Sequence, residues 1–173
     1  IVPPHRSKER VMQILRTVVR HNHELPGSAS ASAQKPALNE ALQKLLPMAK
    51  HDCLVVIITD GFGANDETTR HLALLTEHND VLVAFIYDPL ERELPNAGRL
   101  AFSQGRDQIE LDTSRSALRA DWLADFDDRL QRVQAVTRRY SVPLLPLDTE
   151  RDVLEQVRDL LGYQGQRQRG RCA

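Results

Sequence analysis

The chain has 173 residues, of which 41% are hydrophobic, and its formal net charge is −1. This length and composition suffice for one domain with a sizeable core. A net charge near zero excludes a global electrostatic field that would recruit nucleic acid or an anionic membrane. Two cysteines do not make a disulfide framework and favour a reducing compartment, so a cytoplasmic location is expected. No apolar run approaches the ~20 residues that cross a bilayer.

Apolar residues at helical spacing predict two amphipathic helices in the first part of the chain. The first follows the cap residue Ser7 and continues to His21. The second has Pro36 in its first turn and is ended or kinked by Pro47. Residues 21–35, between them, are rich in Ser, Ala and Gly, which predicts a mobile loop of unusual length.

Two aliphatic runs predict parallel strands that are buried on both faces. The first run, residues 54–59, ends at Asp60, and the second, residues 81–87, ends at Asp88. The segment between the runs has helical spacing and begins at Asp66, its expected cap. The order strand, helix, strand is typical of a right-handed βαβ unit, so the fold class is α/β with a mostly parallel sheet.

The remaining segments predict three further strands, a long helix and a terminal helix. These are a hairpin over residues 99–103 and 108–112, an amphipathic helix over 118–136, and a proline-containing edge strand over 142–147. Thr149 and Asp152 are expected to cap the last helix, which Gly162 closes. We therefore expect one domain over residues 1–162, followed by a disordered basic tail over residues 163–173.

The carboxyl ends of the two central strands predict the functional edge of the sheet. Ligands of open α/β sheets gather at this edge, where Asp60 and Asp88 are expected to face one crevice. Each carboxylate also has a structural alternative. Asp60 can accept hydrogen bonds from loop amides, Asp66 can be only a helix cap, and Asp88 can open an Asp-Pro turn. Residues 91–93, Glu-Arg-Glu, are either part of a partner-facing surface or a solvated charge run.

Three stretches of the sequence resemble the domain of unknown function 58 family. They are PPHRSKERVMQILRTV, CLVVIITDGF and YDPLERELP, and the last is the most specific. With the closing VPLLPLDTERDVLEQVRDLLG, the resemblance covers residues 3–162. It implies a three-layer, Rossmann-like fold of the von Willebrand factor type A kind, with the hairpin as an insertion.

The same resemblance implies a role for the carboxylates at the sheet edge. Asp60 matches the final acidic ligand of the metal-ion-dependent adhesion site in such domains, with Asp66 and Asp88 as possible second-shell residues. The Asp-x-Ser-x-Ser strand that supplies three further ligands does not occur in this sequence. We therefore expect a truncated domain, the carboxyl-terminal portion of a longer protein. Mg²⁺ is implied for the intact protein, and no tight metal binding is expected here.

The expected function is that of a non-enzymatic protein-binding module, since relatives are implied to act beside MoxR-type AAA+ ATPases as adaptors. The alternative is a Mg²⁺-dependent hydrolase of the phosphotransfer kind that uses Asp60 and Asp88. A Gly-rich phosphate cradle and a general base with a recognisable partner are missing from the sequence, which disfavours the alternative. Residues 54–59 have no charge or proline to protect a sheet edge, so we expect a homodimer or an exchange of segments between copies.

Overall fold

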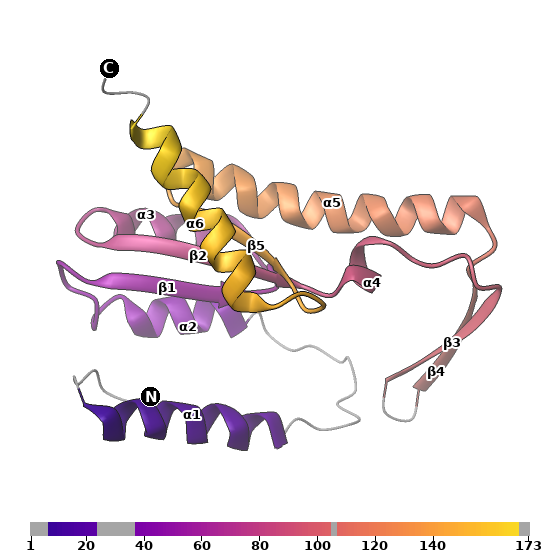
Figure 1. The fold of residues 1–173 in the computed structure, drawn as a ribbon, viewed down its shortest axis with the longest axis horizontal. Helices are drawn as coiled ribbons and strands as arrows, with labels where there is room; N and C mark the ends of the chain where they lie inside the picture. Colours follow the sequence, from indigo (N-terminus) through magenta and orange to yellow (C-terminus); the bar gives the residue numbers. More distant parts are fainter. Residues whose placement is uncertain (1–6, 24–36, 105–106, 170–173) are drawn as a thin grey trace. The chain divides into compact units, whose positions relative to one another are not determined.

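The computed structural model describes residues 7–23, 37–104 and 107–169 (Figure 1). The chain divides into two compact units, Ile1–Ala33 with Ala101–Leu111, and Gln34–Leu100 with Asp112–Ala173. Within the described ranges, no helix is long and apolar enough to cross a membrane. Most of the loop predicted over residues 21–35 lies outside the described residues.

The first unit contains α1 (Lys8–His23) and most of a hairpin formed by β3 (Arg99–Gln104) and β4 (Asp107–Asp112). Ser7 caps α1 as predicted, since its Oγ accepts a hydrogen bond of 3.2 Å from the backbone N–H of Arg10. No residue of α1 is buried, and its apolar side chains are exposed. The hairpin confirms the two strands that the sequence predicted around residues 105–106.

The second unit is built on a parallel sheet of three strands (Figure 1). These are β1 (Leu54–Thr59), β2 (Asp80–Tyr87) and β5 (Leu144–Asp148), and their order across the sheet is β1-β2-β5. The α/β class, the parallel pairing and the edge position of the proline-containing strand are therefore confirmed. Because all three strands run in one direction, the residues that follow them meet at the same edge of the sheet.

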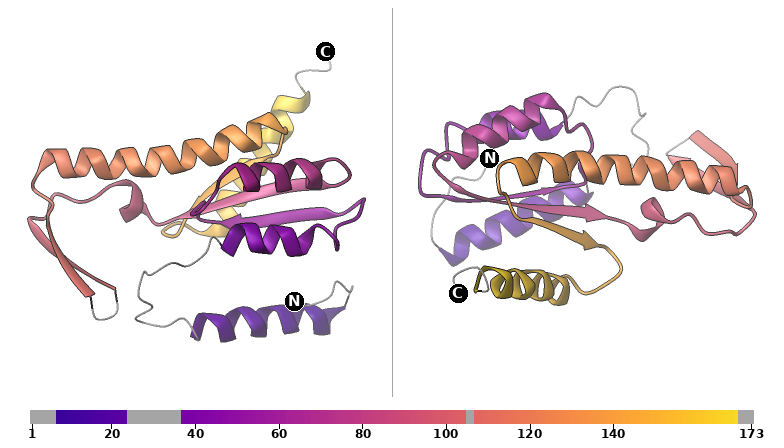
Figure 2. Two further views of the ribbon diagram at one scale, coloured as in Figure 1. Left: turned by 180° about the vertical axis from the view of Figure 1, so that it is seen from behind. Right: turned by 90° about the horizontal axis from the view of Figure 1, so that it is seen from above.

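Among the described residues, five helices belong to this unit, and Figure 2 shows the longer ones on both faces of the sheet. They are α2 (Ala37–Leu45), α3 (Asp66–Thr76), α4 (Pro89–Arg92), α5 (Ser116–Arg139) and α6 (Val153–Arg169). The helix end predicted at Gly162 is wrong, because α6 continues to Arg169. Asp152 caps α6 through the backbone N–H of Glu155 at 3.0 Å, whereas Thr149 binds elsewhere.

Two groups of buried side chains hold the helices to the sheet. On one face, residues of α2, α3 and α5 pack against β1 and β2 around Phe85, which is fully buried. On the other face, Leu145 and Leu147 of β5, with Ala84 of β2, pack against α6 through Val157. The apolar stripe predicted for the long helix therefore forms part of the first core.

The prediction that the first aliphatic strand is buried on both faces is wrong. In β1, Val55 and Ile57 are buried, whereas Leu54, Val56 and Ile58 are 72%, 51% and 72% exposed. The reason lies in the helices, because α6 packs on β2 and β5 and leaves the outer face of β1 uncovered. A run of aliphatic residues has the same sequence pattern whether one or both faces are covered, so periodicity alone did not reveal the difference.

Candidate functional site: the carboxyl edge of the sheet

Asp60 directly follows β1 and begins a tightly turned loop. Its Oδ1 accepts a hydrogen bond of 3.0 Å from the backbone N–H of Phe62, and Thr59 Oγ1 accepts one of 3.0 Å from the N–H of Gly61. Gly61 has φ of +77°, which glycine adopts without strain. The structural alternative predicted for Asp60, a hydrogen bond from a loop amide, therefore holds for one oxygen of its carboxylate, Oδ1. The side chain remains exposed, and among the described residues no hydrogen bond engages its other oxygen.

Phe62 lies two residues after Asp60 and anchors this loop to α5. The guanidinium carbon of Arg129 lies 4.4 Å from the centroid of the Phe62 ring, and the rings of Phe85 and Phe126 lie within 6 Å of the same carbon. This is a cation–π arrangement, which holds an aromatic ring in place without burying it. Phe62 is 65% exposed, so the loop presents a carboxylate and an aromatic side chain to solvent.

Asp88 and Glu91 connect the other two strand ends to the same arginine. Asp88 caps α4, since its Oδ1 accepts from the N–H of Leu90 at 2.9 Å and its own N–H donates to Glu91 Oε1 at 3.1 Å. The second oxygen of Asp88 accepts from Thr149 Oγ1, after β5, at 3.1 Å. Glu91 Oε2 accepts from Arg129 Nη2. The loops after all three strands are thereby joined in one network.

The structure revises the expectations for two groups of charged residues. Asn65, not Asp66, caps α3, because Asn65 Oδ1 accepts from the N–H groups of Glu67 and Thr68 and forms a capping box with Thr68. Asp66 is the first residue of the helix and is exposed. Adjacent Asn and Asp are equally good caps, so the sequence did not separate them. Glu91 does not belong to a solvated charge run, because it is half-buried in its ion pair.

The described residues do not make up a complete cation site. Within the ranges that the structure describes, no group of three or more His, Cys, Asp or Glu side chains is placed to hold a metal ion. Both oxygens of Asp88 already accept hydrogen bonds, which leaves Asp60 as the one carboxylate of the pair with an unengaged oxygen. Mg²⁺ prefers octahedral coordination by oxygen, and one carboxylate does not supply it.

Asp148, at the end of β5, is a further carboxylate of this edge, and it is buried. The side chain of Arg151 donates to Asp148 Oδ2 at 2.7 Å, and the N–H groups of Glu150 and Arg151 donate to Oδ1. The hydrogen bond from the Arg151 side chain is the largest cause that holds the pKa of Asp148 below its usual range. Gln156 of α6 bonds both the N–H and the C=O of Asp148, which fixes the strand end to the helix.

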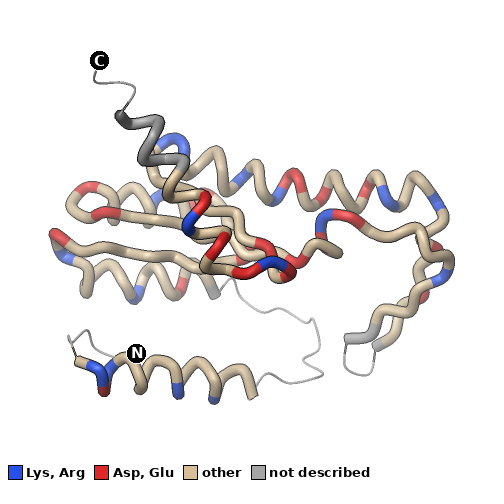
Figure 3. Tube along the Cα trace, in the orientation of Figure 1, with Lys and Arg blue, Asp and Glu red and all other residues tan. Residues whose placement is uncertain are grey.

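A broad groove lies beside the network, at the carboxyl ends of β2 and β5. It has a volume of about 960 Å³ and combines apolar with charged side chains. Its lining comprises Tyr87, Pro89, Leu90, Arg92, Glu93, Leu94, Pro95, Arg119, Ala120, Leu123, Asp148, Glu150 and Arg151. Acidic and basic residues are interspersed around α4 and along α5 (Figure 3), so the groove has no strong charge of one sign.

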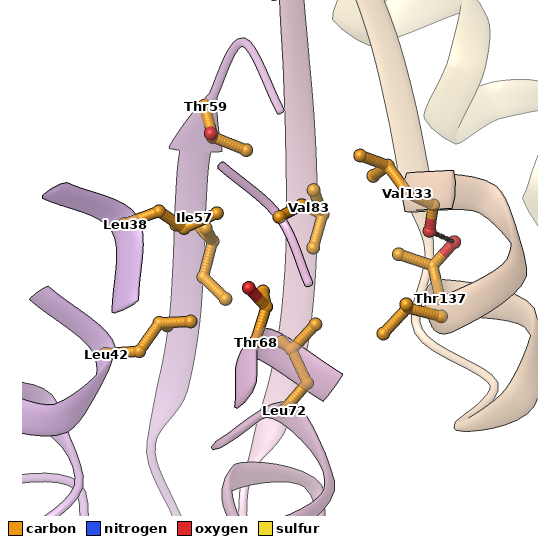
Figure 4. A pocket seen from close by; sticks show the side chains of 11 residues that line it. Leu38, Leu42, Ile57, Thr59, Thr68, Leu72, Val83, Val133 and Thr137 are labelled. Atoms are coloured by element: carbon orange, nitrogen blue, oxygen red, sulfur yellow. Dashed lines mark hydrogen bonds between the residues drawn. The ribbon is translucent and has the colours of Figure 1, made fainter. Parts of the chain in front are cut away.

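A second, much smaller cavity lies inside the core below the Asp60 loop (Figure 4). Its volume is about 20 Å³, and side chains of α2, α3, α5, β1 and β2 line it. The hydroxyls at its wall bond elsewhere: Thr68 Oγ1 donates to Asn39 Oδ1 at 2.6 Å, and Thr137 Oγ1 donates to the C=O of Val133 at 3.0 Å. A space that is this small and lined by apolar atoms is a packing gap and not a ligand site.

Sequence reasoning found Asp60 and Asp88 at this edge but missed Arg129 and Phe62. Arg129 comes directly before Leu130, a residue of the apolar stripe of α5, and this position is the only sequence signal for its partial burial. Its partner Glu91 is 38 residues away in the chain. No local pattern links residues at that separation, so the network could be found only from the fold.

The model of the family described as "Protein of unknown function DUF58" matches residues 1–132, more than half of the chain. No curated protein and no solved structure matches the sequence.

Proposed function

Because the chain belongs to the DUF58 family, whose function is unknown, we propose that it is a non-enzymatic protein-binding module with a von Willebrand factor type A-like core. The partner that the family resemblance suggests is a MoxR-type AAA+ ATPase, for which the chain serves as a cytoplasmic adaptor. The proposal rests on one observation above all. The carboxyl edge presents an exposed carboxylate and an exposed aromatic ring on a loop that is already fixed in place.

Preorganisation makes this loop suited to binding. Exposed aromatic side chains that enter a partner pocket contribute much of the affinity of protein interfaces. Fixing such a side chain before association avoids the entropy that its ordering would cost. Arg129 holds Phe62 from below, and the hydrogen bond from the N–H of Phe62 orients Asp60 beside it. Asp60 then offers its second oxygen to a donor of the partner, such as an arginine or a backbone N–H.

In this proposal the adhesion site is degenerate. Asp60 occupies the position of its final acidic ligand, and the other described residues do not complete the coordination of Mg²⁺. Binding is therefore a direct contact of the edge with the partner protein. One oxygen of Asp88 caps α4 and the other accepts a hydrogen bond from Thr149, which gives no support to the alternative of a Mg²⁺-dependent hydrolase.

Biolayer interferometry with the immobilised chain and a purified MoxR-type ATPase of the same organism, with ATP or ADP, tests the proposal. We expect saturable binding that Phe62→Ser weakens at least about tenfold and Asp60→Asn weakens less. Leu74→Ser, at a 51% exposed position on α3, is the matched control and should bind like the wild type.

Two results would contradict the proposal. If the wild-type chain does not bind the ATPase in either nucleotide state, the partner is wrong. If Phe62→Ser and Leu74→Ser bind equally well, the carboxyl edge is not the contact surface. Mg²⁺-dependent turnover of p-nitrophenyl phosphate that disappears in Asp60→Asn would instead favour the hydrolase.

A further inference from the structure

The groove at the carboxyl ends of β2 and β5 is a preformed surface. All of its lining lies within residues 87–151, and the loop of Asp60 and Phe62 is not part of it. Trp122 Nε1 donates to the C=O of Leu90 at 2.9 Å, which fixes α5 to α4, the two helices that line the groove. Its volume of about 960 Å³ is near the upper limit for small-molecule sites, about 300–1,000 Å³, so it has room for a peptide segment.

Most charged side chains of the groove are already neutralised or hydrated. Asp148 and Arg151 form an ion pair, and Glu93 and Glu150 are exposed to solvent. Arg92 is exposed as well. Water and salt screen exposed charges, so these groups select a ligand only weakly.

Arg119 differs from them because it is half-buried and has no counter-ion. Its Nη1 atom donates to the C=O of Thr113 at 2.6 Å and to the C=O of Ser114 at 2.9 Å. Within the part of the chain that the structure describes, Arg119 makes no ion pair, and neither Nε nor Nη2 donates a hydrogen bond. A charge that is partly removed from water is normally paired, so an anion beside Arg119 would be stabilised.

The two carbonyls also fix which part of Arg119 is available to a ligand. They occupy Nη1 and leave Nε and Nη2, the edge of a guanidinium that binds a carboxylate through two parallel hydrogen bonds. Apolar side chains line the same groove. Leu123, one turn further along α5, is 41% exposed, and Leu90 of α4 is 56% exposed.

We propose that this groove binds a peptide segment of a partner protein in which a single glutamate or aspartate lies next to aliphatic residues. The carboxylate pairs with Arg119, and the aliphatic side chains contact Leu90 and Leu123. A peptide supplies both kinds of group from adjacent side chains. Glu93 and Glu150 line the groove too, and they disfavour further negative charge, so the segment is not an acidic run.

Titration of the labelled full chain with two peptides, followed by two-dimensional NMR spectra, tests the proposal. The probes are acetyl-Ala-Leu-Glu-Leu-Ala-amide and the same peptide with glutamine in place of glutamate, which keeps the shape and removes the charge. We expect saturable shifts of the amide signals of Leu90 and Leu123, with a dissociation constant on the order of 1 mM for the glutamate peptide. The glutamine peptide should bind at least about fivefold more weakly, because charge-assisted hydrogen bonds are the stronger ones.

Variants of α5 separate contact with the ligand from a structural role. Arg119→Gln should bind the two peptides equally, because it removes the charge that distinguishes them, and a role confined to holding Thr113 and Ser114 would not change this preference. Leu123→Ser should weaken both peptides by a similar factor and keep the preference for glutamate. Arg132→Gln, at an exposed position of α5 outside the groove, is the control and should behave like the wild type.

Three results would overturn the proposal. The first is equal binding of the glutamate and glutamine peptides by the wild type. The second is the absence of shifts at peptide concentrations up to about 10 mM. The third is binding of sodium isovalerate with the same affinity and the same shifts as the glutamate peptide, which would make the groove a site for small carboxylates.

Discussion

Gly61 is the point at which the loop that presents Asp60 comes closest to the core. Replacing Gly61 by alanine perturbs this contact. A Cβ atom at this position would lie 2.9 Å from Cε2 of Phe85 and 3.0 Å from Cγ2 of Val133. Both neighbours are buried, at 0% and 7% exposure, so neither can move aside without disturbing the core. The residue also has φ of +77°, which disfavours any side chain.

Gly98 provides a matched control with the same backbone strain and no steric contact. Its φ is +74°, and a Cβ atom there would meet nothing within 4 Å. The left-handed conformation costs alanine about 1–2 kcal/mol at either position. Overpacking adds about 1–3 kcal/mol at Gly61 only. We therefore expect Gly98→Ala to lower the free energy of unfolding by about 1–2 kcal/mol, and Gly61→Ala to lower it by about 2–5 kcal/mol.

Urea denaturation followed by far-ultraviolet circular dichroism measures both free energies of unfolding. The informative quantity is their difference, because the effect of alanine on the unfolded chain is common to the two variants. Equal losses of stability would refute the close packing of Gly61 against Phe85. In the Gly61→Ala background, Phe85→Leu should cost less than in the wild type, since the smaller side chain relieves the contact.

Two further predictions concern charged side chains of the carboxyl edge. Arg129→Met should destabilise the protein by about 2 kcal/mol, because it removes a half-buried ion pair together with the stack on Phe62. Arg132→Met, at an exposed position of the same helix, is the control and should change stability by less than about 0.5 kcal/mol. Equal effects of the two substitutions in urea denaturation would contradict the role of Arg129. Asp148, whose pKa is lowered chiefly by the hydrogen bond from Arg151, stabilises the fold above its unfolded-state pKa, and this contribution is lost as the pH falls through the lowered folded-state pKa. Asp148→Asn should therefore melt below the wild type at neutral pH, with the gap closing as the pH drops below about 4, and a gap that persists in acid would argue against the linkage.

The sequence by itself determined the local elements of this protein. Helical spacing gave α1, α3 and α5, and the alternation of strands with helices gave the parallel sheet and its class. The sequence left Asp88 two roles, facing the crevice or opening an Asp-Pro turn, and in the structure Asp88 caps a short helix that starts at Pro89. These features follow from interactions between residues that are close in the chain, so a single sequence contains enough information to predict them.

The sequence predicted only part of the candidate site. Asp60 and Asp88 could be placed at one edge because parallel strands end on the same side of a sheet. Their roles differ, since Asp88 is engaged by Leu90 and Thr149, whereas Asp60 retains one oxygen without a hydrogen bond among the described residues. That difference depends on α4 and on the loop after β5, which the fold brings together from distant parts of the chain.

Tertiary structure alone decided which surfaces are covered and which residues form the network of the edge. The aliphatic residues of β1 could have filled a core on both sides, but α6 packs over β2 and β5, so one face of β1 stays open. Arg129 could have been one more exposed arginine of a long helix, but α5 places it between Phe62 and Glu91. Burial and ion pairing depend on neighbours that are remote in sequence, and local patterns carry no information about those neighbours.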